Sequence, residues 1–372
     1  RREPEGTHVM ASGSGSTFQK APRDVAIVSV TQDPHSRAVV ERNEVELIQP
    51  IIQRALEQIG VQKGEIDFTC SGSSDYLAGQ AFSFVMTLDA VGAWPPIAES
   101  HVEMDGAWAL YEAWVKIQSG HADTALVYSY GKSSPGDLPL VLSRQLDPYY
   151  YQPLWPDAIA MAGLQARQML DAGLITERRM AEIAYESREA ARNNPNAQLQ
   201  GSPSVDELLA ADFVSDPLRR HDCAPISDGG VAVVLAAGDR ARNWVDRPAW
   251  ITGLDHRIDS HNFGARSLTS APSAKLAAEK AGVGNDKIDV AELHAPFTHQ
   301  HQLLVEALGL GDNVSINPSG GALAANPMMA AGLLRLGEVA NRIMAGEVDR
   351  GVATATSGHL LQQNLVAVLE GA

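Results

Sequence analysis

The sequence predicts an α/β protein made of two similar halves, each a βαβαβ unit. Short apolar runs alternate with amphipathic helical patterns in the order β-α-β-α-β, first over residues 24–130 and again over residues 250–369. That order is typical of a mainly parallel sheet covered by helices. We therefore expect a duplicated fold whose halves superpose.

The two halves also share short sequences at nearly constant offsets. Residues 60–68 (GVQKGEIDF) match residues 282–290 (GVGNDKIDV) at Gly, Val, Ile and Asp. Residues 117–123 (IQSGHAD) match residues 343–349 (IMAGEVD) at Ile, Gly and Asp. The offsets of 222 and 226 residues are what a duplication with small insertions gives. Chance similarity between generic helix–turn–strand units is the alternative.

The first half contains three buried strands and three helices. Pro50 lies within the first helical pattern, so it either kinks that helix or marks its true first turn. The expected strands are Asp24–Val30, Ile66–Thr69 and Ala122–Tyr130, and the expected helices are Glu44–Ile59, Gly79–Leu88 and Gly106–Gln118.

The second half repeats this series and ends in one further strand. The expected strands are Trp250–Leu254, Ile288–Leu293, Gly351–Thr356 and Leu365–Leu369, and the expected helices are Ser270–Ala281, Phe297–Leu308 and Pro327–Met344.

A long insertion separates the two halves. Residues 132–222 carry the aromatic run Tyr149–Trp155, followed by helical patterns at Asp157–Asp171 and Thr176–Asn193. A connection of this length is usually functional or a subdomain of its own. The expected organisation is a tag or disordered segment over 1–20, a first half over 21–245 that includes the insertion, and a second half over 246–372.

The composition excludes several classes of protein. The chain of 372 residues carries a formal charge of −16, which disfavours binding to nucleic acid or to anionic lipid. No apolar stretch approaches the roughly 18 residues that a membrane span needs. The two cysteines, Cys70 and Cys223, exclude a disulfide scaffold and fit a reducing compartment. We expect a cytoplasmic protein.

Local motifs resemble those of the thiolase superfamily over nearly the whole chain after residue 23. The run Ser227–Val234 (SDGGVAVV) is similar to the Asp-Gly-Ala strand that ends the first half in that family. Asn317-Pro318-Ser319-Gly320-Gly321 is similar to the turn of sterol-carrier-type thiolases. The resemblance implies a five-layer α-β-α-β-α fold with an inserted loop subdomain.

The resemblance also locates four positions of thiolase chemistry, and both cysteines are missing from them. Glu103 stands where the family has its nucleophilic cysteine, and His294, in His-Ala-Pro-Phe, keeps the histidine of the second motif. Asn326 replaces the histidine of the third motif, and Ser357-Gly358-His359 matches the glycine loop that carries the second cysteine. Cys70 and Cys223 fall at neither cysteine position, so thiolysis through a covalent acyl-enzyme is not expected.

An enolate-stabilising site without a thiolate suits a retro-aldol reaction of a β-hydroxyacyl-CoA, which is a carbon–carbon lyase reaction. His294 is expected as the base or as a donor to the thioester oxygen, and Asn326 as the other donor. His359 is a second acid/base candidate, and Glu103 accepts a proton or anchors local hydrogen bonds. For His294, His359 and Glu103 a structural role is the alternative. Substrate contacts are expected from Phe297, Gly320, Gly321, Ser357 and Gly358.

No metal is expected. His299 and His301 look like a ligand pair, but two residues apart at a helix start they point to different faces. No covalently bound cofactor is expected either, since coenzyme A enters as part of the substrate.

The cysteine-free members that this chain resembles are lipid-transfer-protein-type aldolases that shorten a steroid side chain held as a CoA thioester. That resemblance implies an acyl-CoA substrate and a small zinc-ribbon/OB-fold partner protein. It also implies a homodimer, or a heterodimer with a thiolase-like homologue, paired through the segment Glu99–Val102. Two alternatives stay open: a non-catalytic subunit that supports an active homologue, and an acyl-CoA acyltransferase.

Overall fold

The core of the protein is a ten-stranded sheet made of two halves with five strands each. Read from its outer edge inward, each half has its strands in the same order. A computed structural model describes residues 23–92 and 97–371, so the expected tag segment 1–20 lies outside the described residues. The strand order is β10-β9-β11-β12-β8-β1-β7-β4-β2-β3. The strands of the sheet are β1 (Val25–Gln32), β2 (Phe68–Gly72), β3 (Glu99–Val102), β4 (Thr124–Gly131), β7 (Gly229–Ala237), β8 (Ala249–Ile258), β9 (Val290–Glu292), β10 (Ser315–Ile316), β11 (Arg350–Ser357) and β12 (Gln363–Glu370).

This order confirms the duplication. In each half three strands run parallel, β2, β3 and β4 in the first and β9, β10 and β11 in the second. The antiparallel strands β7 and β12 then join them to β1 and β8. The halves meet where β1 and β8 pair antiparallel, at Ala26 with Trp250 and Ile27 with Ala249.

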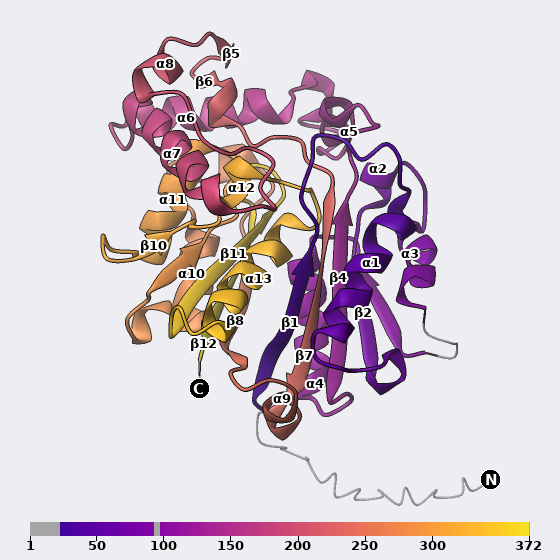
Figure 1. Cartoon of the computed structure of the whole chain (residues 1–372). Coiled ribbons are helices and arrows are strands. Elements are labelled where there is room, and N and C mark those ends of the chain that lie inside the picture. The colour runs from indigo at the N-terminus through magenta and orange to yellow at the C-terminus, as the bar shows by residue number, and fades with distance from the viewer. Residues whose placement is uncertain (1–22, 93–96, 372) are drawn as a thin grey trace, which may run out of the picture.

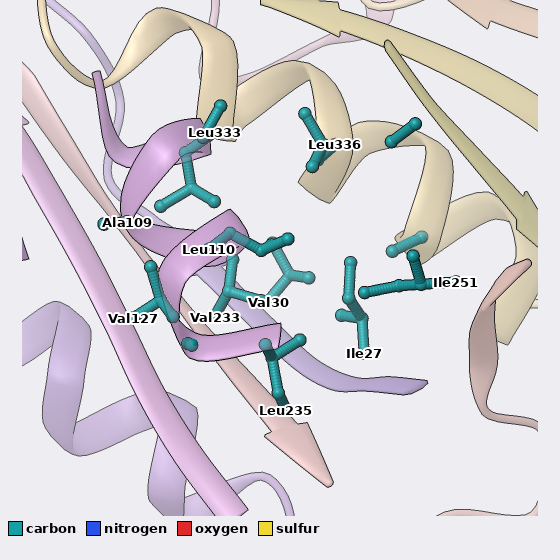
Figure 2. Close-up of a cluster of buried hydrophobic side chains, with 14 of the residues drawn as sticks. Ile27, Val30, Ala109, Leu110, Val127, Val233, Leu235, Ile251, Leu333 and Leu336 are labelled. Atoms are coloured by element: carbon teal, nitrogen blue, oxygen red, sulfur yellow. The ribbon is translucent and has the colours of Figure 1, made fainter. Parts of the chain in front are cut away.

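Helices cover both outer faces and fill the space between the halves, which gives the predicted five layers (Figure 1). The helices of these layers are α1 (Glu44–Glu57), α3 (Ser83–Val91), α4 (Gly106–Gln118), α10 (Pro272–Ala281), α11 (Thr298–Leu308) and α13 (Ala331–Met344). α1 and α3 pack on the first half, and α10 and α11 on the second. α4 and α13 lie in the middle, where Leu110 and Leu336 meet strand residues such as Ile27 (Figure 2).

The two central helices approach closely because glycine stands at their first turns. A Cβ on Gly106 would lie 2.6 Å from Ser129 Cβ and 2.8 Å from Leu333 Cδ2. A Cβ on Gly332 would lie 2.4 Å from Ala355 Cβ. Any side chain at either position would push the halves apart, so the sequence needs glycine there.

One buried carboxylate caps both central helices. Asp105, which is 1% exposed, is the N-cap of α4 and accepts the Ala107 N–H at 2.8 Å. The same carboxylate accepts the Gly332 N–H at 2.8 Å and the Leu333 N–H at 3.0 Å, in the first turn of α13. Backbone donors from both halves, which have no partner inside their own helices, are therefore satisfied by one side chain.

Several element boundaries differ from the sequence prediction. The helix predicted over Gly79–Leu88 is α3, which begins at Ser83, because Gly79 instead ends a short helix that was not predicted, α2 (Asp75–Ala78), in the left-handed conformation at φ +71°. The helix predicted from Pro327 begins at Ala331. α1 starts at Glu44 and runs through Pro50, which therefore does not mark its first turn.

The insertion leaves and re-enters the sheet at paired positions. β4 ends at Gly131 and β7 begins at Gly229, and these two residues pair in the antiparallel ladder. The insertion lies across one end of both halves (Figure 1). It contains α5 (Leu138–Arg144), α6 (Ala158–Asp171), α7 (Glu177–Ala190), α8 (Val205–Leu209), β5 (Phe213–Ser215) and β6 (Leu218–Arg219). Within the described residues, no helix is both long enough and apolar enough to span a membrane.

Replacing Asp105 should destabilise the whole protein. Asp105→Ala leaves three buried N–H groups without an acceptor, so we expect the free energy of unfolding to fall by about 3 kcal/mol or more. Thr176→Ala is the matched control. It removes a cap that serves α7 alone, through the Arg179 N–H at 3.1 Å, and should lower the free energy of unfolding by about 1 kcal/mol. Urea unfolding measures both, and equal losses would contradict the joint capping.

Candidate active site

A cavity of about 480 Å³ lies between the insertion and the ends of the central strands. Its walls come from the segment between β3 and α4, from α5 and α6, from residues 223–226, and from the segments that follow β9 and β11. Parallel strands of an α/β sheet commonly form ligand sites at their carboxyl ends. Seven residues singled out from the sequence line this cavity: Glu103, His294, Phe297, Asn326, Ser357, Gly358 and His359. Gly320 and Gly321 are not among the lining residues.

His294 is buried and both of its ring nitrogens are engaged. Nδ1 accepts the backbone N–H of Thr356 at 3.2 Å, which fixes the proton of the neutral ring on Nε2. Nε2 lies 3.2 Å from Asn326 Oδ1 and donates to it. Burial, together with nearby Arg335, lowers the pKa of His294 to about 4. The ring is therefore a neutral hydrogen-bond donor at neutral pH.

A buried ion pair fixes the turn that leads to Asn326. Arg335 Nη1 on α13 lies 2.8 Å from Glu292 Oε2 at the end of β9. Glu292 also accepts the Ser319 N–H at 2.9 Å and the Ser319 hydroxyl at 2.7 Å. Asn317, at the start of the same turn, accepts the Leu293 N–H at 2.6 Å through Oδ1. β9, the turn and α13 are thereby held in one arrangement around His294.

Gly320 and Gly321 supply the backbone conformation of this turn. Both have positive φ angles, +96° and +61°, in the left-handed region that glycine favours. A Cβ on Gly320 would lie 2.6 Å from Ala191 Cβ of the insertion. These two glycines support the segment that carries Asn326, whose own N–H donates to Ser227 Oγ at 2.9 Å.

His359 lies in the loop after β11, next to Ser357 and Gly358. Arg266 donates to the carbonyls of His359 and Leu360 at 2.9 Å each, which anchors this loop. Burial lowers the pKa of His359 to about 4. Its ring makes no hydrogen bond with the described part of the chain. Both ring nitrogens of His359 are therefore free, in contrast to those of His294.

Glu103 is exposed and holds a local contact. Its Oε1 accepts the Asp75 N–H at 2.6 Å, in the first turn of α2. The helix N-termini of α4 and α13 nearby are already occupied by the Asp105 carboxylate. Burial raises the pKa of Asp105 to about 6, so it is ionised at neutral pH. The N-cap signal of Asp105 before a helical pattern was present in the sequence, but its contact with α13 was not.

Cys223 also lines the cavity, which the sequence analysis missed. It pairs through a β-bridge with Phe297, and its sulfur lies 3.7 Å from the Arg219 carbonyl oxygen. Burial raises the pKa of Cys223 to about 12, as it does for Cys70 in β2. A thiol with so high a pKa is a poor nucleophile at neutral pH. No local sequence signal places Cys223 in the cavity, because a contact between distant segments does so.

The two histidines of the metal-like pair have protein partners. His299 Nε2 lies 3.1 Å from Gln165 Oε1, and His301 Nδ1 lies 3.3 Å from Asn317 Nδ2. Both rings are buried in the packing of α11. Over residues 23–92 and 97–371, no group of three or more histidine, cysteine or acidic side chains could hold a metal ion.

Comparison with known proteins found similar chains but no matching family model. The chain is 26% identical over 372 residues to an acetyl-CoA acetyltransferase of Methanothermobacter thermautotrophicus, which covers 90% of this chain and 95% of that protein. It is 27% identical over 378 residues to human sterol carrier protein 2, which covers 91% of this chain and 68% of that protein.

Solved structures decide the architecture. The Ltp2–ChsH2(DUF35) aldolase superposes with a TM-score of 0.79 and 19% identity, covering 94% of this chain and 98% of that one. Human mitochondrial 3-ketoacyl-CoA thiolase superposes with a TM-score of 0.77 and 15% identity, covering 94% and 99%. The chain has the thiolase fold. The thiolase fold predicted from the motifs is thereby confirmed, together with its duplicated halves.

Acid should destabilise this thiolase fold, because four buried histidines must stay neutral. Burial lowers the pKa of His35 and His299 to about 3, and of His294 and His301 to about 4. Unfolded histidine titrates near 6.5, so this stability is present above pH 6.5 and is lost as the pH falls towards 4. Each histidine should remove about 2 kcal/mol between pH 7 and pH 5. The raised pKa of Asp105 acts in the opposite direction and recovers roughly 1 kcal/mol.

Urea unfolding at pH 7 and pH 5 should therefore show a loss of roughly 7 kcal/mol from these groups. His301→Gln should reduce that difference by about 2 kcal/mol, whatever it does to stability at pH 7. His121→Gln, at an exposed position, is the control and should leave the difference unchanged. A pH-independent free energy of unfolding would contradict the neutral buried rings.

Proposed function

We propose that this protein is a carbon–carbon lyase that cleaves a β-hydroxyacyl-CoA thioester by a retro-aldol reaction. The hydrogen bonds of His294 carry the proposal. Its Nε2–H donates to Asn326 Oδ1 in the structure, and we propose that it turns to the thioester oxygen when substrate binds, beside the Nδ2–H of Asn326, so that two donors stabilise the CoA enolate. The sequence left His294 open as base or donor, and the occupied Nδ1 favours the donor role.

In the proposed reaction a base removes the proton of the β-hydroxyl group. The C–O bond becomes a carbonyl, the Cα–Cβ bond breaks, and its electron pair forms the enolate that His294 and Asn326 stabilise. Protonation of Cα then gives the shortened acyl-CoA, while the other fragment leaves as an aldehyde or ketone. No bond to the protein forms, which agrees with the absence of a reactive thiol at the start of α4.

His359 is the proposed base. Its ring nitrogens are free and it lines the same cavity as His294. Glu103 is less suited, because one of its oxygens already accepts the Asp75 N–H at 2.6 Å. Phe297, Ser357 and Gly358 are proposed to contact the substrate. Gly320 and Gly321 do not line the cavity, and we propose that they hold the turn that positions Asn326 beside His294.

The acyl group of the substrate is proposed to be bulky and apolar, such as a steroid side chain. Leu142, Ile159 and Met161 of the insertion give the cavity an apolar wall. The similarity to sterol carrier protein 2 supports a lipid substrate. The neighbouring Ltp2–ChsH2(DUF35) aldolase supports a small partner protein, which we propose to be a zinc-ribbon/OB-fold chain.

An acyltransferase is the second candidate, because the chain is similar to an acetyl-CoA acetyltransferase and Cys223 lines the cavity. The raised pKa of Cys223 disfavours it. A non-catalytic subunit is a third possibility, which a retro-aldol assay with and without the partner protein separates from an active lyase.

His294 variants test the donor role. His294→Ala should lower turnover roughly 10²–10³-fold, the effect of losing one oxyanion donor. His294→Gln keeps an N–H donor and should therefore recover part of the lost stabilisation of the enolate. Its activity should be at least about tenfold higher than that of the alanine variant. At His359 the same pair should be equally inactive, because glutamine cannot take a proton. A glutamine at 294 as inactive as alanine would instead assign the base to His294.

The cysteine-free protein is the control for a covalent mechanism. Cys70→Ser with Cys223→Ser should leave lyase activity nearly intact. Loss of activity in the Cys223→Ser protein alone, with acyl-enzyme detected by mass spectrometry in the native chain, would reject the lyase and favour the acyltransferase.

We also propose that the protein is a dimer paired through β3. β3 is the outer strand of the first half, and its residues are at least partly exposed. An uncovered edge strand tends to pair with another chain. Light scattering at micromolar concentration should give about twice the 39.7 kDa chain mass, and a monomer would contradict the proposed pairing.

A further inference from the structure

The charges around the cavity point to a restriction on the substrate. Most lining residues are apolar, including Met104, Leu138, Leu142, Ile159, Met161 and Met328. Three carboxylates interrupt this apolar wall: Glu103, Asp105 and Asp157. Among the lining residues in the described part of the chain, none is a lysine or an arginine.

Two arginines close to the cavity contact other groups of the chain. Arg266 donates through Nη1 and Nη2 to the carbonyls of Leu360 and His359, at 2.9 Å each. Arg335 pairs with Glu292 at 2.8 Å, behind the wall that carries His294. Neither guanidinium lines the cavity.

The histidines of the cavity add no positive charge. Burial lowers the pKa of both His294 and His359 to about 4, so both rings are neutral at pH 7. Among the described residues, no group of the wall therefore carries a positive charge that could pair with a carboxylate of a ligand.

The two outer carboxylates are held in place by backbone donors. Glu103 Oε1 accepts the Asp75 N–H at 2.6 Å, and Asp157 Oδ1 accepts the Ala160 N–H at 2.6 Å as the N-cap of α6. These contacts fix the position of both carboxylates at the cavity, where each side chain is also exposed to solvent. An anionic ligand would meet them without a counter-charge.

We propose that this cavity selects acyl-CoA thioesters whose acyl group is apolar and uncharged, and that Glu103 and Asp157 reject acyl groups that end in a carboxylate. The inference rests on the proposed function, since it takes the cavity as the site of the acyl group. The inference specifies the substrate class, because it favours thioesters of neutral acyl groups over thioesters of dicarboxylic acids. It also names the two residues that determine this preference.

Binding of a matched ligand pair tests the inference without needing turnover. The probes are two oxoalkyl-CoA thioethers of equal chain length, one ending in a methyl group and the other in a carboxylate. Neither can be cleaved as a thioester. Isothermal titration calorimetry on the native chain should give at least about tenfold tighter binding of the methyl-ended probe, the effect of a charge buried without a partner.

The double variant Glu103→Gln with Asp157→Asn removes both charges but keeps an oxygen acceptor for each backbone N–H. It should weaken the preference for the methyl-ended probe by about five- to tenfold, chiefly by improving binding of the carboxylate-ended probe. Asp137→Asn is the matched control, since Asp137 caps α5 through the Leu140 N–H and does not line the cavity. It should leave the preference unchanged.

The outcomes separate the inference from the proposed function. Equal binding of the two probes to the native chain overturns the substrate restriction while the acyl-CoA site stands. A preference that persists undiminished in the double variant overturns the role of Glu103 and Asp157. Binding of neither probe overturns the acyl-CoA site itself, and the inference with it.

Discussion

The structure depends on a buried carboxylate shared by two helices. Asp105 accepts N–H groups from the first turns of α4 and α13, which are the central helices of the two halves. Each first turn would otherwise bury donors without acceptors. Because Gly106 and Gly332 let the helices meet closely, a single carboxylate reaches both. The same contact brings the ends of both helices to the cavity, so the core and the site share one constraint.

Electrostatics at the site follow from this arrangement. In a thiolase fold the start of a central helix is a favourable place for an anion, but here Asp105 fills it from within the chain. The chemistry of the cavity then relies on neutral donors. Glu292 and Arg335 fix the turn before Asn326, and the Thr356 N–H fixes the tautomer of His294. Backbone hydrogen bonds and one compensated ion pair orient the proposed donors.

Much of the fold could be predicted because its strands are buried apolar runs and its helices are amphipathic. The periodic pattern gave α4 with its observed bounds and β1 within two residues. It failed where a local signal competed with the pattern, as at Gly79, where a helix was expected to begin and the short helix α2 instead ends. The strand-end positions of His294 and His359 brought both to one cavity. Cys223 could not be predicted there, because its place depends on a bridge to Phe297, 74 residues away.

The insertion has a consequence for how such a protein can change over evolution. It departs at Gly131 and returns at Gly229, two residues already paired in the sheet. The ends of this long segment are held together by the ladder of β4 and β7, so its length adds little to the entropy of closing the loop. α5 and α6 can therefore be reshaped, lengthened or replaced without shifting the register of any core strand. A lineage could exchange the wall that faces the acyl group while it keeps the donors that face the thioester.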